Sequence, residues 1–184
     1  MIPLLYDTII VLGPADRPPS GDIGVQVMQH TKIRAWYTSP PPIEQMLLLP
    51  EGPELASTLD FVIFSGGPMS PLSGDHLSTL CDIGQYIGST EIGIIPCILP
   101  DRDTWNYFEW HPAIECEMQH VAEDIYELII PYKKDLRWIR PHPERAFEPY
   151  FKQNRETGEW RTKDLFRQHP KKPKSWRFYV GVLI

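Results

Sequence analysis

Short apolar runs that stop abruptly at glycine and proline loops constrain the fold of this chain more than any other feature. Such runs span residues 8–12, 60–65 and 92–99. Apolar runs of this length, rich in β-branched and aromatic residues, are typical of strands buried in a parallel sheet. Residues 32–38 mix apolar and polar side chains in rough alternation, which predicts a further strand.

Helical segments are expected between these strands, at residues 23–30, 43–49 and 76–88. In the last segment apolar positions recur at the spacing of one helix face. Alternation of strand and helix predicts an α/β fold: a three-layer, Rossmann- or flavodoxin-like parallel sheet with helices on both faces. Ligands of such sheets bind beyond the carboxyl ends of the strands.

The second half of the chain has a different composition. An amphipathic helix is expected between residues 111 and 130, because apolar residues recur there at helical spacing. The following stretch is rich in proline, tryptophan, arginine and lysine. We therefore expect an α/β domain over residues 1–130 and a proline-rich, basic C-terminal extension over residues 131–184. A hairpin is expected at residues 153–162, and an apolar strand that packs rather than entering water at residues 176–184.

Charge is distributed unevenly along the chain. Residues 1–100 carry 3 Lys+Arg and 10 Asp+Glu, a net charge of −7, whereas residues 151–184 carry 9 and 3, a net charge of +6. The acidic first half disfavours a nucleic-acid-binding core, because phosphates need basic partners. We interpret the basic end as a solvated tail or an arm between subunits of a homo-oligomer, with nucleic-acid binding by this tail as the less favoured alternative.

The same composition guides the expectations for compartment and cofactors. No apolar run approaches the ~18 residues of a membrane helix, and no basic segment precedes the first apolar stretch. Three cysteines without a Cys-x-x-Cys spacing fit a reducing compartment. We therefore expect a cytoplasmic protein with no membrane partner. His111, Glu115 and His120 lack the spacing of metal ligands on one helix face, so we expect no metal and no cofactor.

Two carboxylates are candidates for catalysis. Asp82 lies within the apolar-periodic segment, where a carboxylate costs free energy unless it is paired or useful. Asp75 lies in the polar stretch before it. If the carboxyl ends of the strands meet at one edge, the loops after them bring further residues to the same place. These candidate binding residues are Gly13, Asp16, Ser65, Gly66 and Asn106.

The order of these motifs resembles the nucleoside 2-deoxyribosyltransferase superfamily, which includes related N-glycoside hydrolases of nucleotides. The shared features are a first strand that ends in a glycine loop, an aspartate-led strand, an acidic loop residue, a Glu-Leu-Gly motif on a helix, and a strand that ends in Pro-Asp. In this chain they correspond to Gly13, residues 60–64, Asp75, Asp82-Ile83-Gly84 and Pro100-Asp101. The end of the chain, Phe178-Tyr179-Val180-Gly181, is similar to the family's aromatic-glycine terminus, which reaches a neighbouring subunit's site.

The resemblance implies cleavage or transfer at the N-glycosidic bond of a (deoxy)nucleoside or nucleotide. Asp82 would attack the anomeric carbon and form a glycosyl-enzyme ester, as in retaining glycosidases. Asp75 would protonate or hold the departing base. The chain departs from the family at the nucleophile, which is usually Glu and so one methylene longer than Asp82.

Two alternatives remain open. One is a non-enzymatic assembly protein that kept the fold and uses its aromatic, basic tail for contacts. The other is a protein similar to class I glutamine amidotransferases, with a glycine loop at residues 65–68, Cys97 as nucleophile and His142-Pro143-Glu144 as base and orienting acid. Cys97 lacks the Gly-x-Cys-x-Gly turn of that family, so we interpret it as a core cysteine.

Overall fold

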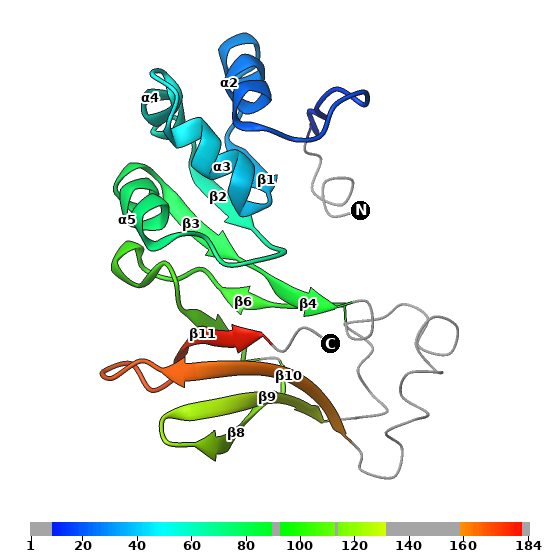
Figure 1. The fold of residues 1–184 in the computed structure, drawn as a ribbon, viewed down its shortest axis with the longest axis vertical. Helices are drawn as coiled ribbons and strands as arrows, with labels where there is room; N and C mark the ends of the chain where they lie inside the picture. The colour runs from blue at the N-terminus through cyan, green and yellow to red at the C-terminus, as the bar shows by residue number, and fades with distance from the viewer. Residues whose placement is uncertain (1–8, 90–92, 113, 132–158, 182–184) are drawn as a thin grey trace.

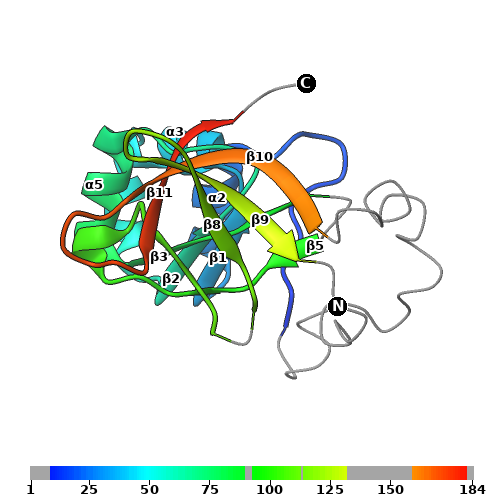
Figure 2. The same ribbon diagram turned by 90° about the horizontal axis from the view of Figure 1, so that it is seen from below.

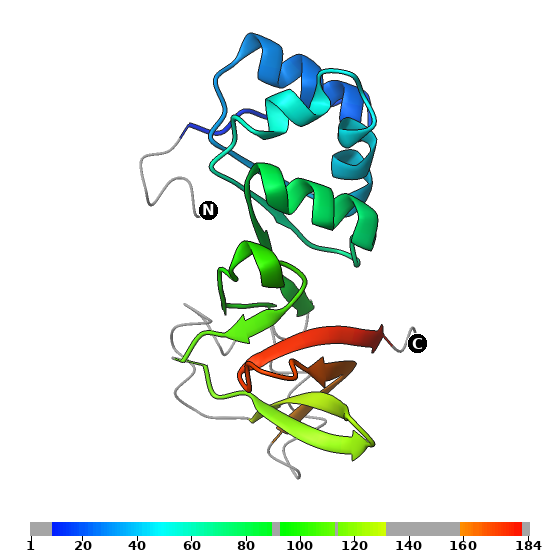
Figure 3. The same ribbon diagram turned by 90° about the vertical axis from the view of Figure 1, so that its left-hand side faces the viewer.

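The computed structural model describes residues 9–89, 93–112, 114–131 and 159–181 (Figure 1). The fold is a mixed α/β fold, with a three-stranded parallel sheet, a six-stranded antiparallel sheet and a two-stranded antiparallel ladder. Figures 1 and 3 show the helices gathered around the parallel sheet at one end of the molecule and the antiparallel sheet at the other. The predicted α/β class is confirmed at this level, but a three-layer Rossmann-like sheet is not.

The parallel sheet has three strands in the order β1-β2-β3. Four helices are interleaved with or precede these strands along the chain. The strands are β1 (Ala35–Thr38), β2 (Phe61–Phe64) and β3 (Asp82–Gln85). The helices are α2 (Gly21–His30), α3 (Pro40–Leu47), α4 (Gly52–Ala56) and α5 (Pro71–Leu80).

Alternation along β2 explains how the helices attach to this sheet. Val62 and Phe64 are buried and belong to a core that also contains helix residues such as Ile43 and Leu77. Side chains on a strand alternate between faces, so the other face carries Phe61 and Ile63, which are only partly buried. The helices that contribute to this core therefore cover the face with Val62 and Phe64. On the opposite face, Phe61 and Ile63 remain partly exposed.

The antiparallel sheet has six strands in the order β6-β7-β11-β10-β9-β8 (Figure 2). A separate two-stranded ladder, β4-β5, and a short 3-10 helix, η1, lie between the two sheets in the sequence. The strands of the large sheet are β6 (Cys97–Ile98), β7 (Phe108–Trp110), β8 (Glu117–Ala122), β9 (Ile125–Pro131), β10 (Glu159–Gln168) and β11 (Ser175–Gly181). The remaining elements are β4 (Ile87–Ser89), β5 (Gly93–Ile95) and η1 (Arg102–Thr104).

Aromatic rings form the core of the antiparallel sheet. Phe166 is fully buried on β10. The rings of Phe108, Trp110 and Phe178 lie edge-on to it, with centroids 5.6–5.8 Å away. Edge-to-face contacts at this separation stabilise a core beyond the burial of area alone.

The predicted first strand is wrong for residues 9–12. These residues form no strand, and Ile9 and Leu12 are 95% and 82% exposed. An apolar run becomes a strand only when a neighbouring strand accepts its backbone hydrogen bonds, and the parallel sheet in the described residues begins at β1.

Two predicted helices are also wrong. The segment 76–88 is helical only as far as Leu80, because Cys81 is extended and Asp82 begins β3. The segment 111–130 forms the β8–β9 hairpin, whose turn contains Glu123 at φ 46°. In both cases pairing with a strand distant in sequence overrides an apolar spacing that also suits a helix.

The predicted strand at residues 92–99 is replaced by the two short strands β5 and β6, which pair antiparallel with different neighbours. Pro96 separates them, and proline cannot donate a ladder hydrogen bond.

Several predictions are confirmed. The helices predicted at residues 23–30 and 43–49 correspond to α2 and α3, which begin two and three residues earlier, and strands occur within 32–38 and 60–65. The apolar end is strand β11 as far as Gly181. The division at residue 131 stays a prediction; strands β10 and β11 pair with β9 and β7. The expected hairpin falls mostly outside the described residues.

None of the helices in the described part of the chain is long and apolar enough to cross a membrane. The cytoplasmic location itself stays a prediction.

Candidate functional site

The carboxyl edge of the parallel sheet carries a polar, glycine-containing loop. Strand β2 continues into residues 65–68 (Ser-Gly-Gly-Pro), called here the glycine loop. The N–H of Ser65 donates to the carbonyl of Thr38 at the end of β1, over 3.3 Å. The N–H of Tyr86, after β3, donates to the carbonyl of Phe64 over 2.9 Å. The three strands therefore end side by side, where open α/β sheets bind ligands.

The glycine loop faces open space. Gly66 has φ 88°, in the left-handed region that favours glycine. A Cβ atom at Gly66 or Gly67 would meet no heavy atom within 4 Å. A ligand can therefore approach the backbone of this loop closely. The prediction that Ser65 and Gly66 lie at the carboxyl edge of the sheet is consistent with this geometry, while their role in binding stays a prediction.

Helix α5 begins at Pro71, three residues after the glycine loop, and its N-cap Ser70 anchors the chain that leaves the loop. The hydroxyl of Ser70 accepts the N–H of Ser73 over 3.3 Å and so caps the helix. The N–H of Ser70 donates to a carboxylate oxygen of Glu44 on α3 over 2.7 Å. The loop is thus tied to β1 at one end and to α3 at the other, which limits its freedom before any ligand arrives.

A cavity of about 170 Å³ lies beside this edge, on the face of β2 turned away from the helix core. It is bounded by residues of β2, β3 and β6 and by the residues next to them. Its mostly apolar lining consists of Phe61, Ile63, Gly84, Gln85, Tyr86, Cys97, Ile98 and Leu99. Engineered apolar cavities of about 150 Å³ bind benzene, so this one has room for a group of that size.

Gly84 keeps this apolar cavity open. A Cβ atom there would lie 3.0 Å from Cδ1 of Leu99 and 3.1 Å from Cγ1 of Ile63. Any larger side chain at position 84 would therefore push these two side chains or occupy the space between them.

A second unusual feature is a bulge in β10. Arg161 pairs with Ile129 and Leu165 with Glu127, so three residues, 162–164, lie opposite Leu128 alone. We call residues 162–164 the β10 bulge. Its central residue, Lys163, has φ 64°, which is uncommon for a residue other than glycine. Such strained positions and bulges are concentrated at functional sites.

The β10 bulge ends in a half-buried carboxylate. Burial raises the pKa of the Asp164 carboxyl above its ordinary value. Among the residues that the structure describes, no hydrogen bond or ion pair reaches this carboxylate. A desolvated carboxylate is a candidate for contact with a ligand. Sequence patterns did not indicate Asp164, although it lies between two basic residues of β10, Lys163 and Arg167.

The two carboxylates predicted to be catalytic both have partners within the described part of the chain. Asp82 is the first residue of β3, at the end of the strand opposite to the glycine loop. Its Oδ1 lies 2.6 Å from Nε of Arg102. Asp75, on α5, accepts a hydrogen bond from Nε1 of Trp105 over 2.9 Å. Both carboxylates thus hold the η1 region against α5 and β3, and the structure does not bring Asp82 to the glycine loop.

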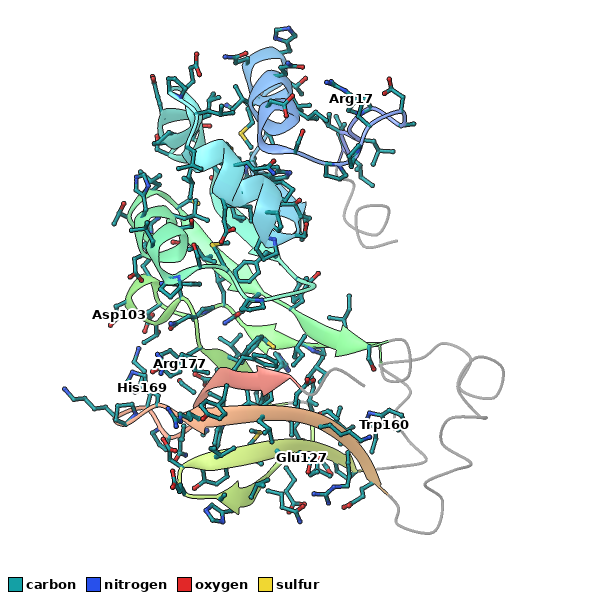
Figure 4. All side chains as sticks on the ribbon, viewed as in Figure 1. Arg17, Asp103, Glu127, Trp160, His169 and Arg177 are labelled. Atoms are coloured by element: carbon teal, nitrogen blue, oxygen red, sulfur yellow. The ribbon has the colours of Figure 1, made fainter. Side chains whose placement is uncertain are left out.

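The other predicted site residues, Gly13, Asp16 and Asn106, are exposed or only partly buried. Gly13 is exposed, and a Cβ there would make only an ordinary contact, 3.8 Å from Cγ2 of Ile23. Asp16 lies in an exposed turn next to Arg17, at the opposite end of the molecule from Glu127 (Figure 4). Asn106 follows Trp105 and is half-buried. Their substrate-binding roles stay untested predictions.

The cysteines do not resemble nucleophiles. Burial raises the pKa of Cys97 and Cys116 to about 12 and that of Cys81 to about 11. Because the thiolate is the reactive form, these thiols are inert at neutral pH. The interpretation of Cys97 as a core cysteine agrees with this result, and His142 lies outside the described residues. Within the described residues there is also no group of three side chains suited to a metal ion.

Solved structures define the class of fold. The amide bond synthetase McbA from Marinactinospora thermotolerans matches with a TM-score of 0.62 at 17% identity, over 89% of this chain and 34% of that one. PA1221, an NRPS protein containing adenylation and PCP domains, matches with a TM-score of 0.62 at 16% identity, over 96% and 38%. At this identity the match shows that the fold is shared.

Curated relatives sharpen the comparison, although no family model matches the chain. The isocyanide synthase-NRPS hybrid crmA of Aspergillus fumigatus is 28% identical over 182 residues, 97% of this chain and 11% of the relative. The carboxylic acid reductase of Neurospora crassa is 28% identical over 184 residues, 96% and 16%. The adenylate-forming reductase Nps10 of Heterobasidion annosum is 26% identical over 146 residues, 78% and 13%. The chain therefore spans only 11–16% of the length of these relatives.

These comparisons overturn the resemblance to nucleoside 2-deoxyribosyltransferases and the N-glycosidic chemistry that it implied. The similarity points instead to adenylate-forming proteins. The structure explains the error, because two of the motifs that carried the resemblance do not exist as predicted. Residues 9–12 form no strand, and Asp82 lies on a strand rather than on a helix.

Proposed function

We propose that this chain is part of an adenylate-forming enzyme that activates a carboxylic acid with ATP. In such a reaction a carboxylate oxygen attacks the α-phosphorus of ATP, and an acyl adenylate and pyrophosphate are formed. The observation that carries this proposal is the similarity to an NRPS hybrid and a carboxylic acid reductase over 96–97% of the chain. Because this chain spans only a small part of these relatives, we assign the activity to a whole protein of which this chain is one part.

The carboxyl edge of the parallel sheet is a suitable place for the nucleotide to bind. The glycine loop is open to solvent, is tied at both ends, and lets a ligand approach its backbone. Successive backbone N–H groups in such turns favour anions, as in other phosphate-binding loops. The ATP or the adenylate would lie against this loop.

The apolar cavity suggests which kind of carboxylic acid the protein prefers. It adjoins the carboxyl ends of β2 and β3, and its lining is mostly apolar. Burial of apolar surface stabilises binding by about 25 cal/mol per Å². We therefore expect an acid with an aromatic ring or a short aliphatic chain to be preferred over a charged one.

The direct test is acid-dependent exchange of labelled pyrophosphate into ATP, measured with acetate, benzoate, 3-phenylpropionate and succinate. We expect exchange with the monocarboxylic acids, highest with benzoate or 3-phenylpropionate. The proposal is wrong if no acid supports exchange and the protein also fails to bind ATP in equilibrium dialysis.

A matched pair of glycine variants tests the placement. Gly66→Val strains a backbone at φ 88° in the glycine loop and should reduce exchange at least about tenfold, since 1.4 kcal/mol is a factor of ten. Gly13→Ala changes another exposed loop that has room for a Cβ and should leave exchange unchanged. Equal effects of both variants would contradict a site at the glycine loop.

A further inference from the structure

The antiparallel sheet carries two arginines directly opposite each other, on the face turned away from its aromatic core. Arg167 on β10 pairs with Arg177 on β11. The next pair, Gln168 with Trp176, lies on the other face, where Trp176 belongs to the core. Residues directly opposite have Cβ atoms about 4.5–5.5 Å apart, and like charges at this distance destabilise a sheet. An anion that lies close to both arginines would remove this electrostatic cost.

Carboxylates of the described residues satisfy these two cations only in part. Nε of Arg167 lies 3.1 Å from Oδ2 of Asp124, yet among the described residues it donates no hydrogen bond, and it is shielded from solvent. Its guanidinium lies over the ring of Tyr179, 4.2 Å from the centroid. The described part of the chain gives Arg177 no ion pair, and its guanidinium lies over Tyr107 at 5.7 Å. Both side chains therefore keep N–H groups that can donate to a ligand.

His169 lies on the same face as the arginine pair. Its backbone N–H donates to the carbonyl of Ser175 over 2.8 Å, which continues the ladder between β10 and β11. Residues two apart on a strand share a face, so His169 stands beside Arg167. Its ring centroid lies 4.6 Å from that of Tyr107, the ring that also contacts Arg177. Figure 4 shows His169 and Arg177 at the same end of the hairpin.

The turn between β10 and β11 fixes the histidine ring as a donor. Nδ1 of His169 accepts the N–H groups of Lys171 and Lys172, each over 3.0 Å. The neutral ring therefore carries its proton on Nε2, which can donate to a ligand. Lys172 is paired with Asp101 over 2.9 Å, whereas Lys171 and Lys174 are exposed and add positive charge to this end of the sheet.

We propose that Arg167, His169 and Arg177 form a binding site for a phosphate group. The planar guanidinium fork matches two oxygens of a phosphate, and the double negative charge suits a pair of cations. Two carboxylates border the site, Asp124 beside Arg167 and Glu109 on β7. They favour a compact anion held by directed hydrogen bonds over a polyanionic chain spread across the sheet. The site lies on a different sheet from the glycine loop and does not depend on the proposed function.

Isothermal titration calorimetry with inorganic phosphate tests the site, at an ionic strength held constant with sodium chloride. The wild-type protein should bind phosphate, and its failure to do so overturns the inference. Arg167→Gln and Arg177→Gln should each weaken binding about tenfold or more, the value of a charge-assisted hydrogen bond. His169→Asn keeps a short acceptor for the turn but loses the donor, and should weaken binding about threefold or more.

Lys174→Gln is the matched control, because it removes the same charge from an exposed residue of the adjoining turn. It should change phosphate affinity by no more than about twofold, since solvent and salt screen a charge that makes no contact. A loss as large as that of the arginine variants would show an effect of net charge and overturn the inference. Methyl phosphate identifies the source: tighter binding than inorganic phosphate assigns the site to a phosphate ester, and weaker binding assigns it to the free ion.

Thermal denaturation distinguishes a binding role from a structural one. Because the two arginines repel each other, Arg177→Gln should not lower the melting temperature without phosphate. Phosphate should raise the melting temperature of the wild-type protein and not that of this variant. Equal shifts in both proteins would overturn the inference. Gly66→Val, in the glycine loop, should bind phosphate as the wild-type protein does, so failure of the nucleotide site and failure of this site are distinguishable.

Discussion

The two sheets of this molecule are stabilised in different ways. The parallel sheet is covered by helices that lie next to its strands in the sequence, and its core contains aliphatic residues such as Ile43, Val62 and Leu77. The antiparallel sheet combines strands from residues 97–131 and 159–181, and its core is mainly aromatic. The first sheet therefore depends on segments that are neighbours in the sequence, whereas the second depends on contacts between distant segments.

A few polar contacts join the two regions at η1. Trp105, next to η1, enters the helix-side core and bonds to Asp75, while Arg102 pairs with Asp82. On the other side, Nζ of Lys172 lies 2.9 Å from Oδ2 of Asp101. The η1 segment therefore connects the two regions.

The largest expected effect tests the aromatic core. Phe166→Ala should lower the free energy of unfolding by about 3–5 kcal/mol, because it leaves a cavity among rings that are fully packed. Ile43→Val, in the aliphatic core, should cost about 0.5–1.5 kcal/mol. Urea denaturation followed by tryptophan fluorescence measures both. A cost below that of Ile43→Val would show that the antiparallel core does not depend on this ring.

A substitution at Gly74, which packs against Trp105 beside η1, tests the contact between the two regions. Gly74→Ala places a Cβ 2.1 Å from the indole of Trp105, a rigid ring that must shift, and should destabilise the fold by about 1–3 kcal/mol. Gly67→Ala, whose Cβ meets nothing within 4 Å, is the matched control and should be near neutral. Thermal denaturation of the two variants compares them, and equal melting temperatures would contradict the tight packing at this point.

The buried thiol of Cys97, on β6 of the antiparallel sheet, should make the free energy of unfolding depend on pH. The folded pKa of Cys97, raised by burial to about 12, exceeds the unfolded value of 9.0. The unfolded state therefore loses its proton first, and stability that is complete below pH 9 is lost as the pH rises toward 12. Relative to Cys97→Ala, the wild-type protein should lose about 1.4 kcal/mol between pH 8 and pH 10. Parallel curves for the two proteins in urea titrations would show that this thiol is not desolvated.

The smallest effects concern the carboxylates that hold η1. Asp75→Ala should cost about 1 kcal/mol, the value of one hydrogen bond. Asp82→Ala removes an ion pair whose carboxylate is 45% exposed and should cost about 0–1 kcal/mol. Neither variant should change pyrophosphate exchange by more than about twofold. A loss of exchange with unchanged stability would show that these carboxylates take part in the reaction.

The sequence predicted the parts of the fold in which local pattern and tertiary structure agree. Strand β2 and its glycine loop follow from a short apolar run and a turn signal, and both survive in the structure. The loop's place at the edge of the sheet follows from the general behaviour of parallel strands.

The remaining features depend on partners that no local pattern reveals. Residues 9–12 have the composition of a buried strand but no strand beside them. The apolar spacing of residues 118–129 suits a helix as well as a hairpin, and pairing with β10 decides in favour of the hairpin. Asp164 becomes noticeable only when the β10 bulge and the burial of its side chain are seen.

The position of β11 has a consequence for how the protein is made. This strand is the last that the structure describes, yet it lies in the middle of its sheet, between β7 and β10. Until it leaves the ribosome, the β6–β7 pair and the β8–β9–β10 group present open edges that can pair with other chains. Slow synthesis or early termination before residue 175 would therefore expose the nascent chain to aggregation and increase its need for chaperones.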